Sequence, residues 1–189
     1  MTPRDRLCRL FARRSFRTGE FVLASGRTSD FYIDCRTTTM HAEGQVLLGI
    51  VGLACLHEAG VQPDLVGGLT MGADPIAYAI AAESWRHGTP IHAFSVRKRA
   101  KRHGRGQLIE GCFESGARVV IVEDVITTGG SALQACAAVR QAGGSVLAIL
   151  AAIDRQEGGR EKIEADGHQV ITMYGVDDLR ASLARDPIP

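Results

Sequence analysis

The chain has 189 residues, of which 45% are hydrophobic and 23% charged, and its formal net charge at pH 7 is +1. This length and hydrophobic content are enough for one domain with a substantial core. A net charge so close to zero argues against general binding to nucleic-acid backbones, which requires a strong basic excess.

The cysteines and the apolar runs bear on where the protein works. Five cysteines, odd in number and without C-x-x-C spacing, argue against a disulfide framework or a zinc site and indicate reduced thiols. No apolar run reaches the roughly 18 residues of a membrane span, and the first residues lack the apolar region of a signal peptide. We therefore expect a cytoplasmic protein without nucleic-acid or membrane partners.

The N-terminal third predicts a helix, a hairpin and a second helix. Thr2 and Pro3 are typical of a helix start, and an apolar stripe continues this helix to about Phe16. Residues 21–34 contain two short aromatic and apolar runs around a Ser-Gly turn, which indicates a β-hairpin. Helical periodicity over 41–59 then ends at a glycine, a natural helix stop.

From residue 65 onward, short apolar runs alternate with helical patterns. This alternation predicts right-handed βαβ units and a mainly parallel sheet covered by helices on both faces. Because ligands bind beyond the carboxyl ends of parallel strands, we expect the loops 68–73, 123–131 and 154–158 to lie at one sheet edge. Asp74 is expected to cap the helix that Pro75 opens. The expected strands cover residues 65–66, 91–96, 119–122, 146–153 and 170–173, and further helices cover 132–141 and 177–184.

Residues 119–131, VVIVEDVITTGGS, contain the most specific pattern in the chain. The apolar run at 119–122 is typical of a strand buried on both faces, and we expect this strand to stop at Glu123 and Asp124. Hydroxyl and glycine residues follow just before a helix, where backbone N–H groups and the helix dipole favour an anion. Neither a nucleotide-triphosphatase loop nor a G-x-G-x-x-G pattern occurs. A carboxylate pair beside a phosphate loop suits a sugar phosphate, with the acids on vicinal hydroxyls.

Residues 97–106 hold six permanent cations and one histidine, with no apolar side chain larger than alanine. Self-repulsion and glycines predict an exposed, mobile loop. Composition alone leaves three interpretations open: a solvated charge run, a nucleic-acid patch, or a lid over a polyanion. The neighbouring sugar-phosphate pattern favours the lid, because a concentrated anion needs its charge neutralised.

Four motifs in the chain resemble those of known families. The stretch 119–131 resembles the signature of the type I phosphoribosyltransferases, whose shared substrate is phosphoribosyl pyrophosphate (PRPP). Three other segments resemble motifs of the orotate phosphoribosyltransferases: SGRTSDFYID at 25–34 the hood over the base, RKRAKRHG at 97–104 the catalytic loop, and IDRQEG at 153–158 the orotate-binding segment. The resemblance extends from about Arg17 to about Ile171.

The resemblance implies the α/β fold of the type I phosphoribosyltransferases, with a central, mainly parallel sheet flanked by helices and a small N-terminal hood. We expect a single domain over residues 1–189. Within it, a helix and hood segment would cover about 1–35, and an α/β core would cover about 41–175 and carry the mobile loop 97–107.

The resemblance also implies an activity: transfer of the phosphoribosyl group from PRPP to orotate, giving orotidine 5′-phosphate and pyrophosphate in pyrimidine biosynthesis. Mg²⁺ is the expected cofactor, held mainly through substrate oxygens, and no protein ligand for it is assigned. The expected catalytic residues are Arg97, Lys98, Lys101, His103 and Asp124. The expected PRPP-binding residues are Arg97, Lys98, Lys101, His103, Glu123, Asp124, Val125, Ile126, Thr127, Thr128, Gly129, Gly130 and Ser131.

For the base, the resemblance points to Arg155 and Thr127. The planar guanidinium fork of an arginine can bind the orotate carboxylate through two hydrogen bonds, although an ordinary surface arginine fits the bare sequence equally well. Some members of the family have lysines where this chain has Ala24 and, in the pyrophosphate loop, Met71-Gly72. Those two positive charges are therefore missing here.

The expected assembly is a homodimer that shares the loop 97–107 between subunits. Arg97, Lys101 and His103 would reach the neighbour's site, whereas Lys98 would serve its own. Two alternatives stay open: a phosphoribosyltransferase for another base, or a PRPP-sensing regulator on the same fold. Arg155 and the hood motif disfavour the first, and the lack of an evident helix-turn-helix or basic tail disfavours the second.

Overall fold

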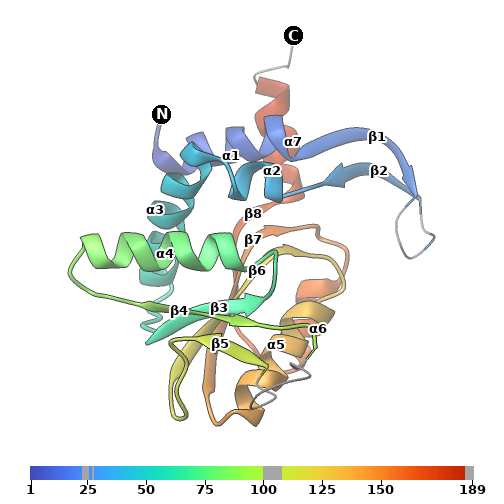
Figure 1. Ribbon diagram of the computed structural model, residues 1–189. Coiled ribbons are helices and arrows are strands. Elements are labelled where there is room, and N and C mark those ends of the chain that lie inside the picture. The colour runs from blue at the N-terminus through green and yellow to red at the C-terminus, as the bar shows by residue number, and fades with distance from the viewer. Residues whose placement is uncertain (23–25, 27, 100–107, 186–189) are drawn as a thin grey trace.

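The computed structural model describes residues 1–22, 26, 28–99 and 108–185. Within these residues the chain forms a six-stranded sheet with helices on both faces and a separate two-stranded hairpin (Figure 1). The elements in chain order are α1 (Pro3–Arg14), β1 (Phe16–Val22), β2 (Thr28–Ile33), α2 (Arg36–Thr39), α3 (Ala42–Glu58), β3 (Leu65–Leu69), α4 (Asp74–Arg86), β4 (His92–Val96), β5 (Ile109–Gly111), β6 (Arg118–Ile126), α5 (Gly130–Gln141), β7 (Ser145–Asp154), α6 (Gly159–Ala165), β8 (Val170–Gly175) and α7 (Val176–Arg185).

The N-terminal helix and the hairpin follow the sequence prediction. Thr2 caps α1, and its hydroxyl and the Asp5 carboxylate exchange hydrogen bonds with each other's backbone N–H groups. Strands β1 and β2 pair antiparallel, and β1 begins at Phe16 rather than at the predicted Phe21. The Phe16 ring stacks on that of Phe31, with centroids 5.5 Å apart, so the base of the hairpin carries an aromatic contact between its strands.

The large sheet has the strand order β5-β4-β3-β6-β7-β8. Neighbouring strands from β4 to β8 run parallel, and only β5 pairs antiparallel, with β4. The chain goes from β3 outward to β4 and then returns to place β6 on the other side of β3. Ligands of doubly wound sheets bind beyond the strand ends at such a reversal, which here lies between β3 and β6.

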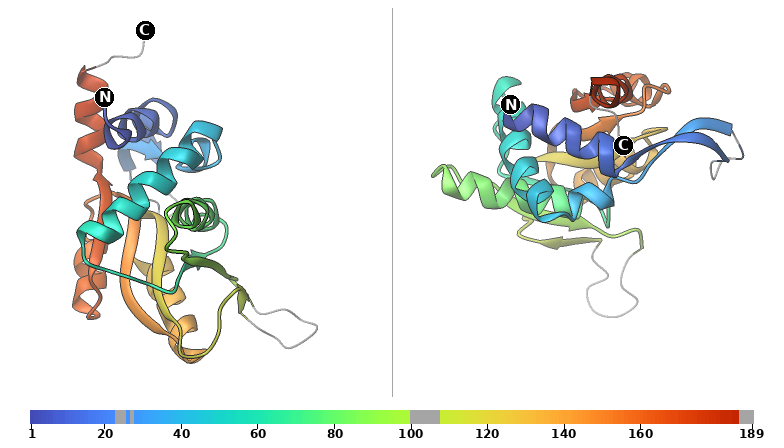
Figure 2. Two further views of the ribbon diagram at one scale, coloured as in Figure 1. Left: turned by 90° about the vertical axis from the view of Figure 1, so that its left-hand side faces the viewer. Right: turned by 90° about the horizontal axis from the view of Figure 1, so that it is seen from above.

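The core consists of two apolar layers, one on each face of the sheet. Side chains of α1, α3, α4 and α7 pack on one face, together with Val120 and Val122 of β6. Side chains of α5 and α6 pack on the other face, together with Val119 and Ile121 (Figure 2). All four valine and isoleucine side chains of this run are at most 1% exposed, which confirms the prediction of a strand buried on both faces.

Three sequence-based expectations about the core are corrected. Strand β6 does not stop at Glu123 but continues to Ile126, because pairing with β7 continues through Val125 and Ile153. Asp74 does not cap α4: the cap residue is Ala73, and the Asp74 carboxylate instead accepts hydrogen bonds from side-chain hydroxyls (below). Strand β3 continues to Leu69 and is longer than the predicted 65–66, because its pairing with β4 extends to Leu69 and Val96, so the turn after it begins at residue 70 rather than at 68. In addition, the short elements α2, β5 and α6 were not predicted, since they have too few residues to show a clear period.

No helix in the described ranges is long and apolar enough to span a membrane. The cysteines Cys8, Cys35, Cys55, Cys112 and Cys136 are all free thiols.

Candidate active site

The three predicted loops meet at one edge of the sheet. Strands β3, β6 and β7 are adjacent and parallel, so the segments that follow them lie side by side. The backbone N–H of Arg155 donates to the carbonyl of Ile126, 3.1 Å away, which joins the end of β7 to the end of β6. On the other side, Gly72 lies against the Asp124 carboxyl group. The predicted convergence of loops is thus confirmed.

The segment 127–131 has the geometry of an anion cradle. Gly129 caps α5 with φ 76°, a left-handed conformation that glycine adopts without strain. A β-carbon on Gly129 would also lie only 2.8 Å from Ile163 Cγ1 and 2.9 Å from the Gly159 carbonyl oxygen. Thr127, Thr128 and Ser131 are exposed beside this helix start. Exposed hydroxyl side chains and the N-terminus of α5 therefore lie together, and this combination favours the binding of a phosphate.

Glu123 and Asp124 are not two equivalent carboxylates. Glu123 is 8% exposed, and burial together with the neighbouring Asp124 raises its pKa to about 9, so Glu123 is neutral at pH 7 and can donate a hydrogen bond. Asp124 is half-buried, and its Oδ1 accepts from the backbone N–H of Val125 at 2.9 Å. The two neighbouring acids thus differ: Glu123 is a buried neutral acid, and the half-buried Asp124 carboxyl group raises the pKa of Glu123 further.

Arg97 and Lys98 leave the sheet at the same edge. The N–H of Thr70 donates to the carbonyl of Val96 at 2.8 Å, so the end of β4 is joined to the turn after β3. Arg97 Nη1 lies 3.5 Å from Glu110 Oε1 on β5. Lys98 is exposed, and its charge opposes the rise in the pKa of Glu123. The other two predicted loop residues, Lys101 and His103, lie outside the described residues, as does Ala24.

Asp74 connects the turn after β3 to β4. One carboxylate oxygen accepts from Thr70 Oγ1 at 2.6 Å, and the other accepts from Ser95 Oγ at 2.7 Å. Tyr78 Oη lies 3.0 Å from the same Ser95 hydroxyl. The turn 70–73 after β3 is therefore held from its C-terminal end by a side chain that the sequence suggested only as a helix cap.

Arg155 is a buried residue and not an ordinary surface arginine, since it is only 6% exposed. Its guanidinium group donates to Glu157 and to Ser29 of the hairpin, and it lies 4.3 Å from the ring centroid of Phe31. Its backbone is bonded to Ile126, the residue before Thr127. The two predicted base contacts are therefore brought together beside the hairpin, and Glu157 is the partner that the sequence did not reveal.

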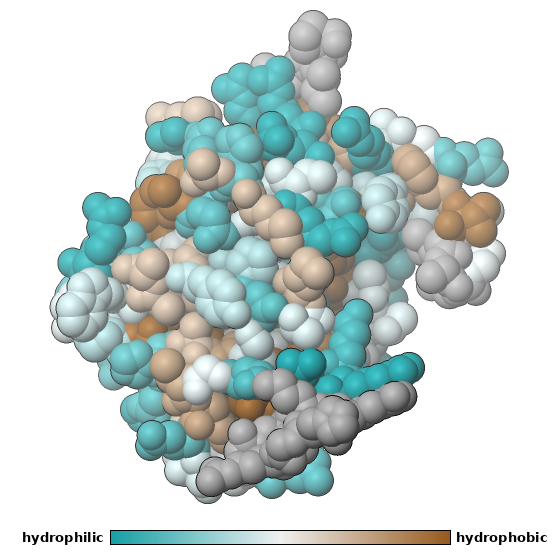
Figure 3. Space-filling model, in the orientation of Figure 1, coloured by the Kyte–Doolittle hydropathy of each residue, from teal (hydrophilic) through white to brown (hydrophobic). Residues whose placement is uncertain are grey.

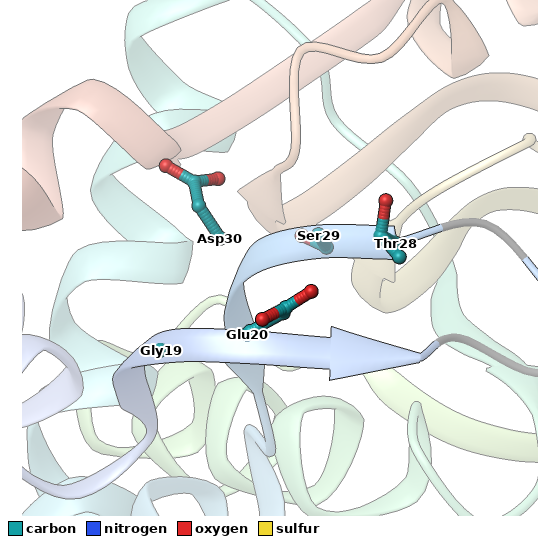
Figure 4. Close-up of a pocket in the computed structure, with 5 residues that line it drawn as sticks. All are labelled: Gly19, Glu20, Thr28, Ser29 and Asp30. Carbon is teal, nitrogen blue, oxygen red and sulfur yellow. The ribbon is translucent and has the colours of Figure 1, made fainter.

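A pocket of about 380 Å³ lies along the hairpin (Figure 4). Ser29, which accepts from Arg155, is one of its lining residues. In Figure 4 the Asp30 carboxylate points away from Thr28 and Glu20, and it pairs with Arg180 of α7 at 2.9 Å. The lining residues are Gly19, Glu20, Thr28, Ser29 and Asp30.

A larger cavity of about 1020 Å³ lies elsewhere. Its lining includes residues 60–63 before β3, Pro90 and Ile91 before β4, and Arg118 at the start of β6. It therefore lies at the edge where the strands begin, opposite the edge that carries the predicted residues, and it contains none of them. We place the candidate active site at the carboxyl edge, where the switch in strand order, the phosphate cradle and Arg155 coincide.

The fold and this cradle define a phosphoribosyltransferase, and comparisons with known proteins agree. The family described as "Phosphoribosyl transferase domain" matches residues 53–173. An orotate phosphoribosyltransferase of Aquifex aeolicus is 43% identical over 95% of this chain and 98% of its own length. One from Rhodopseudomonas palustris is 45% identical, with coverages of 95% and 97%.

A solved structure shows the same relationship. The orotate phosphoribosyltransferase of Mycobacterium tuberculosis in complex with PRPP superposes with a TM-score of 0.80 at 39% identity, covering 95% of this chain and 99% of that one. The chain belongs to the orotate phosphoribosyltransferase family.

Proposed function

We propose that this protein transfers the phosphoribosyl group of PRPP to orotate, giving orotidine 5′-phosphate and pyrophosphate in pyrimidine biosynthesis. The observation that carries the proposal is the buried Arg155, whose backbone is bonded to Ile126 directly before the phosphate cradle. A buried guanidinium suits a base that bears a carboxylate. Neither adenine nor hypoxanthine offers such a group.

The reaction is a substitution at the anomeric carbon of the ribose. The bond between C1 and the pyrophosphate oxygen breaks with its electron pair leaving on pyrophosphate, the bond from C1 to the orotate ring nitrogen forms, and that nitrogen loses its proton. No protein nucleophile is needed. The chain contributes positioning: residues 127–131 hold the 5-phosphate, and Glu123 and Asp124 hold the ribose hydroxyls.

The leaving pyrophosphate requires positive charge. Arg97 and Lys98, which follow β4 at the carboxyl edge, are assigned to supply this charge, and Lys101 and His103 are assigned to the same task from the resemblance alone. Lysine and histidine can also donate a proton to the departing oxygen. Charge neutralisation at this leaving group is the main electrostatic contribution we assign to the protein.

Mg²⁺ is proposed as the cofactor. In the described part of the chain no three His, Cys, Asp or Glu side chains gather as a metal site, and the half-buried Asp124 carboxylate lies at the carboxyl edge. This donor set fits a metal that keeps waters and binds chiefly through substrate phosphates. When bound, the ion would neutralise charge on the pyrophosphate.

A homodimer that shares the loop 97–107 is proposed for the assembly. Helices α3 and α4 pack closely, since a β-carbon at Gly49 would come within 2.6 Å of the Ala79 carbonyl oxygen. Their outer face carries large exposed apolar side chains, among them Val46, Tyr78 and Trp85, and Figure 3 shows brown and pale side chains among teal ones in this region. We propose that a second copy covers this face, since α4 directly follows the turn 70–73.

We further propose that residues 1–189 act as one domain in the cytoplasm. The hood, within residues 1–35, is joined to the core of residues 41–175 by the contact of Ser29 with Arg155, and to the helix α7 that follows the core by the contact of Asp30 with Arg180. Five free thiols are compatible with a reducing compartment.

The test of the base assignment is Arg155→Ala, with orotate and PRPP affinities measured separately by calorimetry. Loss of a buried charge-assisted contact weakens orotate binding by on the order of 2 kcal/mol or more, whereas PRPP binding is retained. Arg160→Ala is the matched control, because Arg160 pairs with Glu164 on the exposed side of α6. Unchanged orotate affinity in Arg155→Ala would rule out the assignment.

A further inference from the structure

Arg155 is held from one side by Glu157. Arg155 Nε and Nη2 donate to the same oxygen, Glu157 Oε1, at 3.1 and 2.7 Å. The Arg155 side chain is 5% exposed and that of Glu157 24%. This ion pair is thus mostly shielded from water, unlike the pairs of Arg160 and Arg180, whose arginine side chains are 40% and 44% exposed.

The backbone between the two residues is shaped to make this contact. Gln156 has φ 58°, a left-handed conformation that is uncommon outside glycine. Its N–H donates to the carboxylate of the buried Asp154 at 2.8 Å, and its side-chain oxygen accepts from the N–H of Asp177 at 3.3 Å. The backbone and the side chain of Gln156 are therefore both held, and the chain turns at this residue and brings Glu157 back onto Arg155.

The remaining contacts fix the plane of the guanidinium group. The Phe31 ring lies 4.3 Å from Arg155 Cζ, and Ser29 Oγ accepts from Nη2 at 3.2 Å. A guanidinium group has two edges that can each take a carboxylate, one formed by Nε with one terminal nitrogen and one formed by both terminal nitrogens. Glu157 takes the edge with Nε. On the edge with both terminal nitrogens, Nη2 already donates to Ser29 Oγ. A second carboxylate can bind this edge through Nη1 and by replacing Ser29 as the acceptor of Nη2.

The geometry points to Glu157 as the positioning residue that orients Arg155 toward the orotate carboxylate and so makes the site selective for an acidic base. This inference rests on the proposed function, because it assumes that Arg155 binds orotate. Glu157 stays paired through Nε while the substrate carboxylate binds the other edge in place of the Ser29 hydroxyl. Without Glu157, the buried guanidinium group loses its counter-charge and one of the contacts that orient it. The affinity of the site for a base with a carboxylate then exceeds its affinity for uracil by a smaller factor.

The experiment compares Glu157→Ala with Glu157→Gln, which keeps an acceptor oxygen of the same shape without the charge. In Glu157→Ala the KM and the calorimetric dissociation constant for orotate rise about tenfold, the size of coupling expected within one ion-pair network. The preference for orotate over uracil falls by a similar factor, while PRPP affinity and kcat at saturating orotate change little. For Glu157→Gln, the orotate affinity and the preference for orotate over uracil lie between those of Glu157→Ala and those of the unmodified protein.

Glu164→Gln is the matched control, since Glu164 pairs with Arg160 on an exposed helix face, and it leaves all these quantities unchanged. PRPP binding by each variant verifies that the site is folded. Unchanged orotate affinity in both Glu157 variants would overturn the inference. Tighter orotate binding would overturn it too, because Glu157 would then compete with the substrate. If Arg155→Ala binds orotate normally, the base assignment itself fails; if Arg155→Ala is weakened and Glu157→Ala is not, only the positioning role fails.

Discussion

Gly72 lies directly against the carboxyl group of Asp124: a β-carbon at position 72 would come within 2.6 Å of both Cγ and Oδ1. The turn after β3 and the acid on β6 therefore share one small space. Some members of the family have a lysine close to this position. In this chain the glycine makes room for the carboxylate of the proposed ribose site.

This contact predicts the effect of Gly72→Ala. The added methyl group has to displace the Asp124 carboxyl group, so PRPP binding weakens by about 1 kcal/mol or more, the usual cost of overpacking. The measurement is calorimetric titration with PRPP and Mg²⁺. A double-mutant cycle supplies the control: in an Asp124→Gly background the methyl group has space, and Gly72→Ala costs little further affinity. Equal losses in both backgrounds would show that Gly72 acts independently of Asp124.

Glu123 predicts a pH dependence of stability. Its pKa lies at about 9 in the folded protein against an ordinary 4.5, so between these values the folded state binds a proton that the unfolded state has lost. The free energy of unfolding therefore decreases as the pH rises from about 4.5 to about 9, because folding then has to keep a proton on Glu123 that the unfolded chain releases. Glu123→Gln keeps a neutral group of the same shape, and its Tm advantage over the unmodified protein grows with pH. Parallel Tm profiles for the two proteins would contradict the buried neutral acid.

The contacts of Asp74 lead us to expect that the turn 70–73 contributes to PRPP affinity. Asp74→Ala removes the acceptor of the Thr70 and Ser95 hydroxyl groups. The loss of a partner for these partly buried groups lowers the free energy of unfolding by about 1–3 kcal/mol. Because the turn is no longer held by Asp74, the PRPP dissociation constant also rises. Thermal denaturation and PRPP titration measure the two effects. Asp64→Ala is the matched control, because Asp64 pairs with Arg118 on an exposed surface at the opposite edge. Similar results for both variants would remove the special role of Asp74.

The shared loop predicts complementation between two inactive variants. Lys101→Ala is defective in the donated loop and Asp124→Asn in the receiving ribose site, so a mixed dimer contains one site with both residues intact. Random pairing makes about half of the dimers mixed, and recovered activity approaches about a quarter of the unmodified level. Mixed dimers, verified by tag selection, that stay as inactive as their parents would exclude a loop shared between subunits.

The sequence predicted those parts of the fold in which each residue's surroundings follow from local pattern. The run at Val119–Val122 has no polar alternation, and only a strand covered on both faces suits it. Thr2 and Pro3 fixed the start of α1 through backbone groups within the same turn. The convergence of the loops after β3, β6 and β7 followed from the rule for parallel strands.

The contacts within the site were less predictable, because they depend on residues distant in the chain. Asp74 is a residue type that commonly caps helices, and it stands directly before Pro75. Its partner Ser95, however, lies 21 positions away on β4, so local sequence does not reveal this contact. From the sequence, Glu123 is expected to be an ionised carboxylate. Its burial and the neighbouring Asp124, which raise its pKa, are known only from the structure. Arg155 and Glu157 are close in sequence, but their contact depends on the left-handed conformation of Gln156. This conformation was not predictable, because it is typical of glycine and asparagine rather than glutamine.

The central claim is that this site joins orotate to the ribose of PRPP, and the most direct measurement is base consumption by the purified protein. With PRPP and Mg²⁺ present, the account predicts that the absorbance of orotate falls and that one pyrophosphate is released for each orotate consumed, while adenine, hypoxanthine and xanthine persist. Consumption of a purine base in preference to orotate, or pyrophosphate release that does not depend on orotate, would contradict it.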